Sequence, residues 1–103
     1  MALWVNPGTP EQLNALSRNT LVEWIGIEIT EVGDDFVRGR MPVDQRTHQP
    51  YGLLHGGASV VLAETLGSIA GAMVVAGTGA KVVGLEINAN HLLAVHSGWV
   101  IGT

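Results

Sequence analysis

The sequence contains no cysteine, and this absence excludes several classes of chemistry. Without thiols the chain has no disulfides, no thiolate metal ligands and no thiol nucleophile. Basic residues are also few, with five Lys and Arg against nine Asp and Glu, which gives a net charge of −4. General nucleic-acid binding needs a basic face, so we expect no nucleic-acid partner.

Several familiar motifs are absent as well. The four histidines lack the spacing of zinc motifs such as HExxH, so we expect no metal site. No GxSxG, P-loop or GxGxxG motif precedes a helix. The N-terminal MALWVNPGTPEQ has no basic stretch followed by an apolar run. We therefore expect no signal peptide and a cytoplasmic location.

Apolar residues, by contrast, are abundant. Hydrophobic residues make up 47% of the 103 residues, which is enough for one domain covering residues 1–103. A chain this small gains stability from a partner subunit. The run from Ala58 to Ala76 is long enough to cross a bilayer and has Glu64 as its one ionisable residue. Because no basic residue flanks the run and a central carboxylate is costly in lipid, we expect a helix buried in protein and no membrane span.

The pattern of apolar and turn-forming residues predicts an α+β domain. Thr9, Pro10 and Gln12 are typical of a capped helix start, and this short helix should end near Arg18-Asn19. A strand is expected in 21–32, a turn at 33–35 and a second strand over 36–43, in which Pro42 should end the pairing or sit on an edge. An irregular loop over 44–54, a long helix broken at 77–79, and strands over 81–91 and 99–103 should follow. This order fits one antiparallel sheet curled around a central helix.

The stretch HGGASVVLAE, residues 55–64, is the strongest candidate for chemistry. A carboxylate on a helix with apolar residues on all sides is desolvated, which favours the role of base or nucleophile for Glu64, although a structural carboxylate remains an alternative. Gly56 and Gly57 stand where the helix begins, so its free N–H groups would stabilise a developing oxyanion. Ser68 lies one turn beyond Glu64, and His55 and Gln49 lie just before the helix.

These segments resemble a known family. The stretch MPVDQRTHQPYGLLHGGASVVLAETLGSIAG, followed by KVVGLEINANH, resembles the hotdog-fold acyl-CoA thioesterases. Within them it is most similar to the 4-hydroxybenzoyl-CoA thioesterase subgroup with a helix glutamate, and to the 1,4-dihydroxy-2-naphthoyl-CoA hydrolases of menaquinone biosynthesis. The resemblance implies hydrolysis of an aromatic or medium-chain acyl-CoA to a free acid and coenzyme A, without a cofactor.

The resemblance also implies the roles of individual residues. Glu64 would attack the thioester or activate water, and the Gly56 N–H would polarise its carbonyl. Gln49 and His55 would orient the thioester, and Ser68 would help to place water or the acyl group. Contacts with coenzyme A would come from Val83, Gly84, His91, Leu92, Leu93 and Ala94.

The family further implies an assembly. Each site would be shared by two copies of the chain, Gln49 and Gly56 from one and Glu64 and Ser68 from the other, in a homodimer that forms a homotetramer. Relatives continue for about thirty more residues, so we expect the C-terminal strands of this domain to be missing. Lys81 is the only Lys or Arg after Arg46, which leaves few partners for the coenzyme A phosphates.

Two functions other than hydrolysis also fit these residues. A hotdog hydratase or dehydratase also carries a helix carboxylate near a histidine, but it releases no thiol. A non-catalytic acyl-CoA-binding domain would be stabilised by ligand without turnover.

Overall fold

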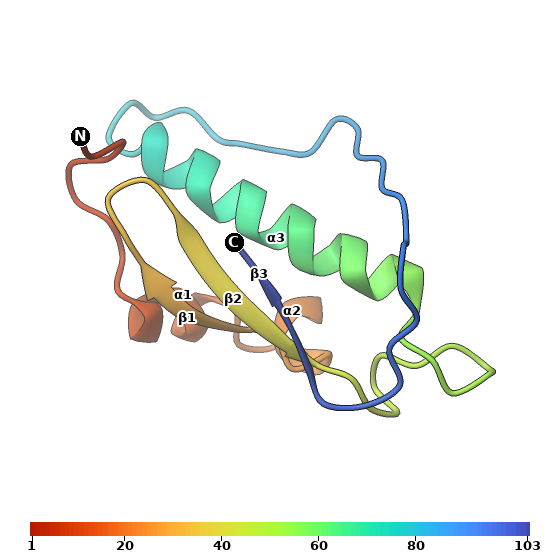
Figure 1. The fold of residues 1–103 in the computed structure, drawn as a ribbon. Helices are drawn as coiled ribbons and strands as arrows, with labels where there is room; N and C mark the ends of the chain where they lie inside the picture. Colours follow the sequence, from red (N-terminus) through yellow and green to blue (C-terminus); the bar gives the residue numbers. More distant parts are fainter.

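The computed structural model describes all residues 1–103 and consists of a three-stranded antiparallel sheet packed against one long helix (Figure 1). The elements in chain order are α1 (Pro10–Leu16), α2 (Leu21–Trp24), β1 (Glu28–Val32), β2 (Val37–Pro42), α3 (Gly56–Val74) and β3 (Trp99–Gly102). The strands lie in the order β1-β2-β3. The predicted α+β architecture, an antiparallel sheet around a long helix, is confirmed.

The N-terminal helix begins as its sequence predicts. Thr9 Oγ1 accepts a hydrogen bond from the Gln12 N–H at 3.2 Å, and Gln12 Oε1 accepts one from the Thr9 N–H at 3.0 Å. This reciprocal capping box satisfies two backbone donors that a helix start otherwise leaves free. The helix ends at Leu16, slightly earlier than expected.

The region predicted as one strand over 21–32 divides into two elements. Leu21–Trp24 forms the helical turn α2, and Gly26, at φ +80°, redirects the chain into β1. A side chain at Gly26 would meet Pro42 at 2.7 Å, so this reversal also depends on close packing. The predicted hairpin and the end of β2 at Pro42 are confirmed.

The core lies between one face of the sheet and one face of α3. Ile27, Ile29 and Met41 are buried from the sheet side. Leu62 and Leu66 are buried from the helix side. The outer face of the sheet is polar and carries the Arg38–Glu31 and Arg40–Glu28 ion pairs, with Arg40 stacked 4.0 Å above the Trp99 ring centre.

The prediction of a strand over Lys81–His91 is wrong. The chain from 80 to 98 runs beside α3 without regular secondary structure, as Figure 1 shows. None of residues 81–91 makes a backbone–backbone hydrogen bond. Strand propensity there is high, but a strand forms only where a neighbouring strand accepts its hydrogen bonds, and none lies alongside. The next predicted strand is confirmed as β3, antiparallel to β2.

The long helix α3 is apolar enough to cross a membrane by length and composition, with a mean hydropathy of 1.5. In this fold it packs on the sheet through Leu62, Leu66 and Met73. The opposite face, which includes Ala63, Glu64 and Gly67, is exposed in the single chain. The helix therefore has one face covered by the sheet and a second face that the segment after α3 covers only in part.

Candidate functional site

The start of α3 presents a free backbone donor beside a histidine. His55 caps the helix in an extended conformation, and its Nδ1 accepts a hydrogen bond from the Gly57 N–H at 2.8 Å. The neutral ring therefore carries its proton on Nε2. The Gly56 N–H makes no hydrogen bond within the chain. A free N–H at a helix N-terminus favours a partner with negative charge.

The loop before α3 holds Gln49 through its side-chain oxygen. Gln49 Oε1 accepts hydrogen bonds from the Tyr51 N–H at 2.5 Å and from the Leu53 N–H at 3.3 Å. Its Nε2 has no partner within the chain. The amide thus offers hydrogen-bond donors outward, as the Gly56 N–H does.

The Gln49 amide and the Gly56 N–H lie in one cavity of about 360 Å³, together with residues that were expected to contact coenzyme A. Gln49 and Gly56 line it together with His91 and the three residues after it, Leu92, Leu93 and Ala94. The His91 ring lies against Gly56, since a Cβ added there would stand 2.7 Å from His91 Nε2. His55 is exposed and does not line this cavity. Proximity in space thus brings together two groups of residues some 40 positions apart in sequence.

Glu64 and Ser68 line a second cavity, of about 250 Å³, with Val83 and Gly84. The Glu64 carboxylate packs so closely on Gly84 that a Cβ at that position would collide with Glu64 Oε1. The prediction that Glu64 is desolvated is wrong for the single chain, where its side chain is exposed. The reason is that only the opposite face of α3 is covered by the sheet.

The two cavities separate the expected catalytic residues into two sets. Gly56 and Glu64 are on the same helix, eight residues apart. This separation corresponds to about 12 Å along the axis at 1.5 Å per residue. One chain therefore does not bring the oxyanion donor and the carboxylate to one point.

Sequence reasoning missed several residues in these cavities. Ser59 lines the first cavity, one turn after Gly56, and its spacing of three residues was the signal that could have identified it. Glu86 is exposed and lines the second cavity with Glu64. Glu86 Oε1 accepts a hydrogen bond from Asn88 Nδ2 at 3.0 Å.

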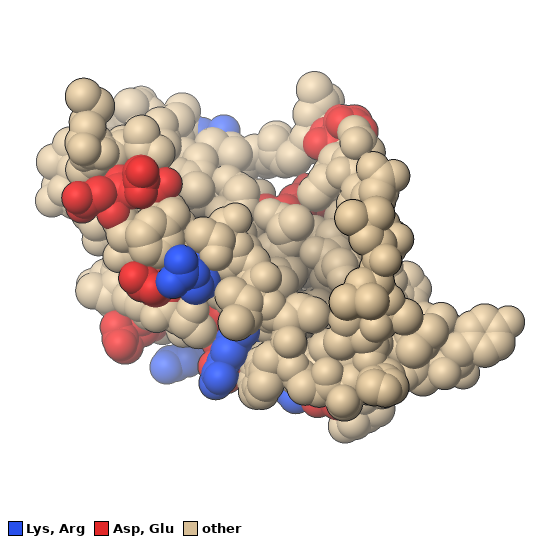
Figure 2. Space-filling model, viewed as in Figure 1, with Lys and Arg blue, Asp and Glu red and all other residues tan.

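Basic side chains and metal-binding clusters are absent from both cavities. No cluster of three or more His, Asp and Glu side chains is suited to hold a metal ion. Most charged side chains lie over the N-terminal helices and the β1–β2 hairpin, and a smaller acidic group lies over the segment that follows α3, whereas the loop projecting at the right of Figure 2 carries none. Neither cavity is lined by Lys or Arg. The free donors in the first cavity are therefore backbone and neutral side-chain groups.

The largest hollow lies elsewhere, between α3 and β3, with a volume of about 690 Å³. Leu62, Leu66 and Ile101 give it a largely apolar lining. It contains neither Glu64 nor the Gly56 N–H. This hollow is an apolar edge of the core, and its size is no indication of catalysis.

Comparison with known proteins gives a consistent result. Residues 51–103 match the family model described as the thioesterase superfamily. The chain is 57% identical over 100 residues to the proofreading thioesterase EntH of Cronobacter turicensis, a match that covers 97% of this chain and 72% of that protein. A thioesterase from Haemophilus influenzae superposes with a TM-score of 0.91 at 54% identity, covering 96% of this chain and 68% of the other. A variant thioesterase from Pseudomonas aeruginosa gives 0.93 at 49% identity, covering 97% and 72%.

Proposed function

Since this chain belongs to the thioesterase superfamily and is a thioester hydrolase with the hotdog fold, we propose that it hydrolyses an aromatic acyl-CoA, of the hydroxybenzoyl or dihydroxynaphthoyl type, to the free acid and coenzyme A. Medium-chain acyl groups are the alternative substrates. The observation that carries the proposal is the pairing of a donor-lined cavity at the start of α3 with a carboxylate further along the same helix.

The proposed chemistry begins at the donor-lined cavity. The thioester carbonyl oxygen accepts the free Gly56 N–H, and negative charge that develops on this oxygen is stabilised at the helix N-terminus. Gln49 and His55 orient the thioester through Nε2 donors, because their acceptor atoms are already occupied. Donors placed in this way favour the charged tetrahedral intermediate over the neutral thioester.

Glu64 supplies the attack. Its carboxylate either bonds to the carbonyl carbon or removes a proton from a water that does so, and Ser68 positions that water or the acyl group. The intermediate collapses by breaking the carbon–sulfur bond. In the general-base route the proton that Glu64 took from water passes to the sulfur, and coenzyme A leaves as the thiol; in the nucleophilic route it leaves as the thiolate and takes up the proton released when water cleaves the anhydride. In the nucleophilic route a second water then cleaves the anhydride formed at Glu64.

We propose that the active site forms between two copies of the chain. Support comes from the separation of about 12 Å between Gly56 and Glu64 along one helix. The exposed face of α3 that carries Glu64 is the surface we assign to the partner. A dimer of such dimers is the assembly we expect, with coenzyme A held by Val83, Gly84 and residues 91–94.

The test is thiol release from benzoyl-CoA by the Glu64→Gln variant. This substitution keeps the size of the side chain but removes its basicity, so we expect turnover to fall by about 10²–10⁴-fold with the melting temperature unchanged. Ser68→Ala should lower the rate less than Glu64→Gln does. Undiminished thiol release by a folded Glu64→Gln protein would refute the mechanism.

A single turnover in ¹⁸O-water separates the two roles of Glu64. Nucleophilic attack forms an anhydride, and its hydrolysis leaves ¹⁸O in the Glu64 carboxylate when water attacks that carbonyl. General-base catalysis places all of the label in the product acid. Mass spectrometry of the peptide that contains Glu64 gives the answer.

A second candidate is proofreading, the removal of wrongly formed thioesters. The EntH relative bears that description, and the absence of Lys and Arg from both cavities favours recognition of the thioester itself over the nucleotide of coenzyme A. Comparison of benzoyl-CoA with benzoyl-pantetheine tests it. Similar kcat/KM values support proofreading of varied thioesters, and a large preference for benzoyl-CoA argues against it.

A further inference from the structure

Hydrogen bonds within its own loop fix the side-chain amide of Gln49, and they determine which end of the amide, the oxygen or the NH₂ group, is free to bind a ligand. Both partners of Gln49 Oε1 are backbone N–H groups, those of Tyr51 and Leu53. An amide nitrogen in that place would face two donors without an acceptor, so the orientation of the amide follows from its chemistry. The free end of Gln49 is therefore its NH₂ group.

A tight turn produces this arrangement. The Gly52 N–H donates to the Gln49 carbonyl at 2.9 Å, and the Gln49 N–H donates to the Leu53 carbonyl at 2.7 Å. Pro50 occupies the second position of the turn, and Gly52 adopts φ +79°, where residues with a Cβ are strained. Nothing lies within 4 Å of a Cβ built on Gly52. Backbone conformation alone, and not crowding, therefore requires glycine there.

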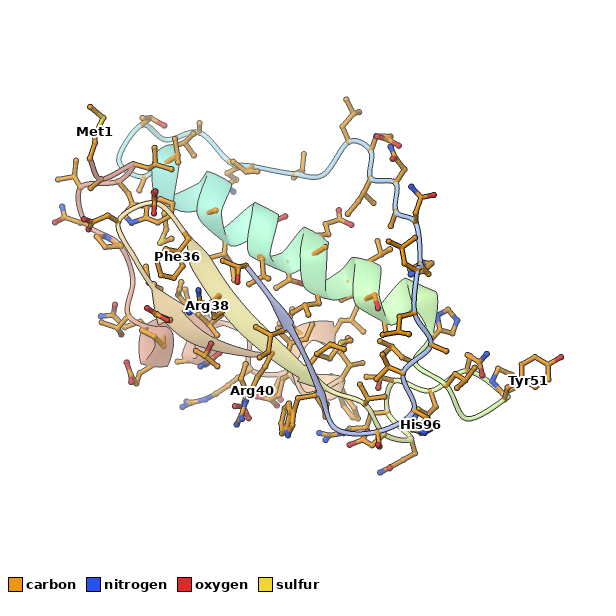
Figure 3. The ribbon with its side chains drawn as sticks, in the orientation of Figure 1. Met1, Phe36, Arg38, Arg40, Tyr51 and His96 are labelled. Carbon is orange, nitrogen blue, oxygen red and sulfur yellow. The ribbon has the colours of Figure 1, made fainter.

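The base of the turn is anchored to the segment that precedes β3. His48 Nε2 donates to the His96 carbonyl at 3.1 Å, and the Leu54 N–H donates to the Val95 carbonyl at 2.7 Å. The Tyr51 ring contributes nothing to this anchoring, because it projects into solvent at the tip (Figure 3). Tyr51 acts in the turn through its backbone N–H. A change of backbone angle at Gly52 would thus act on the tip while the base stays in place.

We propose that Gly52 is a positioning residue for thioester hydrolysis: its left-handed backbone holds the Tyr51 and Leu53 N–H groups on Gln49 Oε1, so that Gln49 Nε2 is presented as a fixed donor to the thioester. This proposal rests on the function proposed above. Gly52 touches no substrate and acts through Gln49. It extends the machinery to a residue that lies outside the cavity lining.

The experiment compares Gly52→Ala with Gly77→Ala. Gly77 has φ +84° and also has nothing within 4 Å of an added Cβ, so the two substitutions impose the same kind of backbone strain. Gly77 follows the end of α3, far from Gln49. We expect Gly52→Ala to lower kcat/KM at least tenfold, mainly through kcat, and Gly77→Ala to leave it within twofold. Melting temperatures should fall by similar amounts in both.

Two further variants keep the proposal testable if Gly52→Ala folds poorly. Asparagine tolerates left-handed backbone angles better than alanine, so Gly52→Asn should recover most of the kcat lost in Gly52→Ala. In Gln49→Glu the turn still has an acceptor for both N–H groups, but the outward atom becomes an acceptor. We expect its kcat to fall at least tenfold, with a melting temperature close to that of the unaltered protein.

Two outcomes would overturn the proposal. One is an equal loss of kcat/KM in Gly52→Ala and Gly77→Ala, and the other is full activity in Gln49→Glu. Failure of the proposed function gives a different pattern, because the unaltered protein would then release no thiol from benzoyl-CoA, or Glu64→Gln would release it undiminished, whatever happens at Gly52. The two hypotheses are therefore separable in one set of assays.

Discussion

Mixing two inactive variants tests whether the active site is shared between chains. Gln49→Ala removes a donor from the first cavity, and Glu64→Ala removes the carboxylate from the second. Along α3, Gly56 and Glu64 are separated by about 12 Å, whereas the oxyanion donor and the attacking oxygen must each lie about 3 Å from one carbonyl group. A shared site therefore predicts that the two damaged chains complement each other.

The size of the recovery follows from the geometry of a two-fold dimer. When equal amounts of the variants are unfolded and refolded together, about half of the dimers are mixed, and one of the two sites in each mixed dimer is intact. We expect about a quarter of the unaltered kcat, with KM unchanged. Each variant refolded alone should lose about 10²-fold or more in kcat.

The matched control uses a chain that carries both substitutions. Mixed in equal amounts with the unaltered chain, it leaves about a quarter of the sites intact if they are shared, and about half if each chain holds its own site. Thiol release from benzoyl-CoA measures both mixtures, and native mass spectrometry verifies that mixed dimers formed. No recovery in a sample that contains mixed dimers would refute the shared site.

The remaining predictions concern stability. Leu66→Ala should reduce the free energy of unfolding by about 2–5 kcal/mol, because Leu66 is 6% exposed and packs on the sheet. The control is Leu16→Ala, at a residue 79% exposed, which should change this free energy by less than about 0.5 kcal/mol. Urea titrations measure both. The hydrogen bond from Arg46 holds the pKa of Asp44 below its ordinary value of 3.8, so Asp44 contributes stability above that pH and loses it as the pH falls through the lowered value. The difference in unfolding free energy between the unaltered protein and Asp44→Asn should therefore be present at pH 6 and shrink in acid, and a difference that grows on acidification would contradict this reasoning.

Local signals in the sequence predicted the elements that depend on local interactions. The Thr9–Gln12 capping box needs only residues three apart, and the structure confirms it. The β1–β2 hairpin depends on a short turn between alternating segments, and it too is confirmed. The start of α3 after His55 belongs to the same class.

Features that depend on distant neighbours could not be predicted in the same way. Residues 81–91 have the composition of a strand, but strand formation requires a partner that no local pattern specifies. Burial of Glu64 depends on what covers the second face of α3, and apolar composition says only that something could. The cavity that joins Gln49 to His91 likewise depends on the path of the chain after α3.

Under the proposed mechanism, His55 both caps α3 and orients the thioester, and the two roles favour different side chains. Ser, Asn and Asp are the residues most favoured at a helix N-cap, so stability by itself would replace this histidine. Each of these shorter side chains could accept the Gly57 N–H, but none would extend an imidazole Nε2 donor beyond it. Selection for a more stable fold and selection for thioester hydrolysis therefore pull this position in opposite directions. A sequence optimised for stability alone would replace the histidine and so lose the Nε2 donor that the proposed mechanism uses.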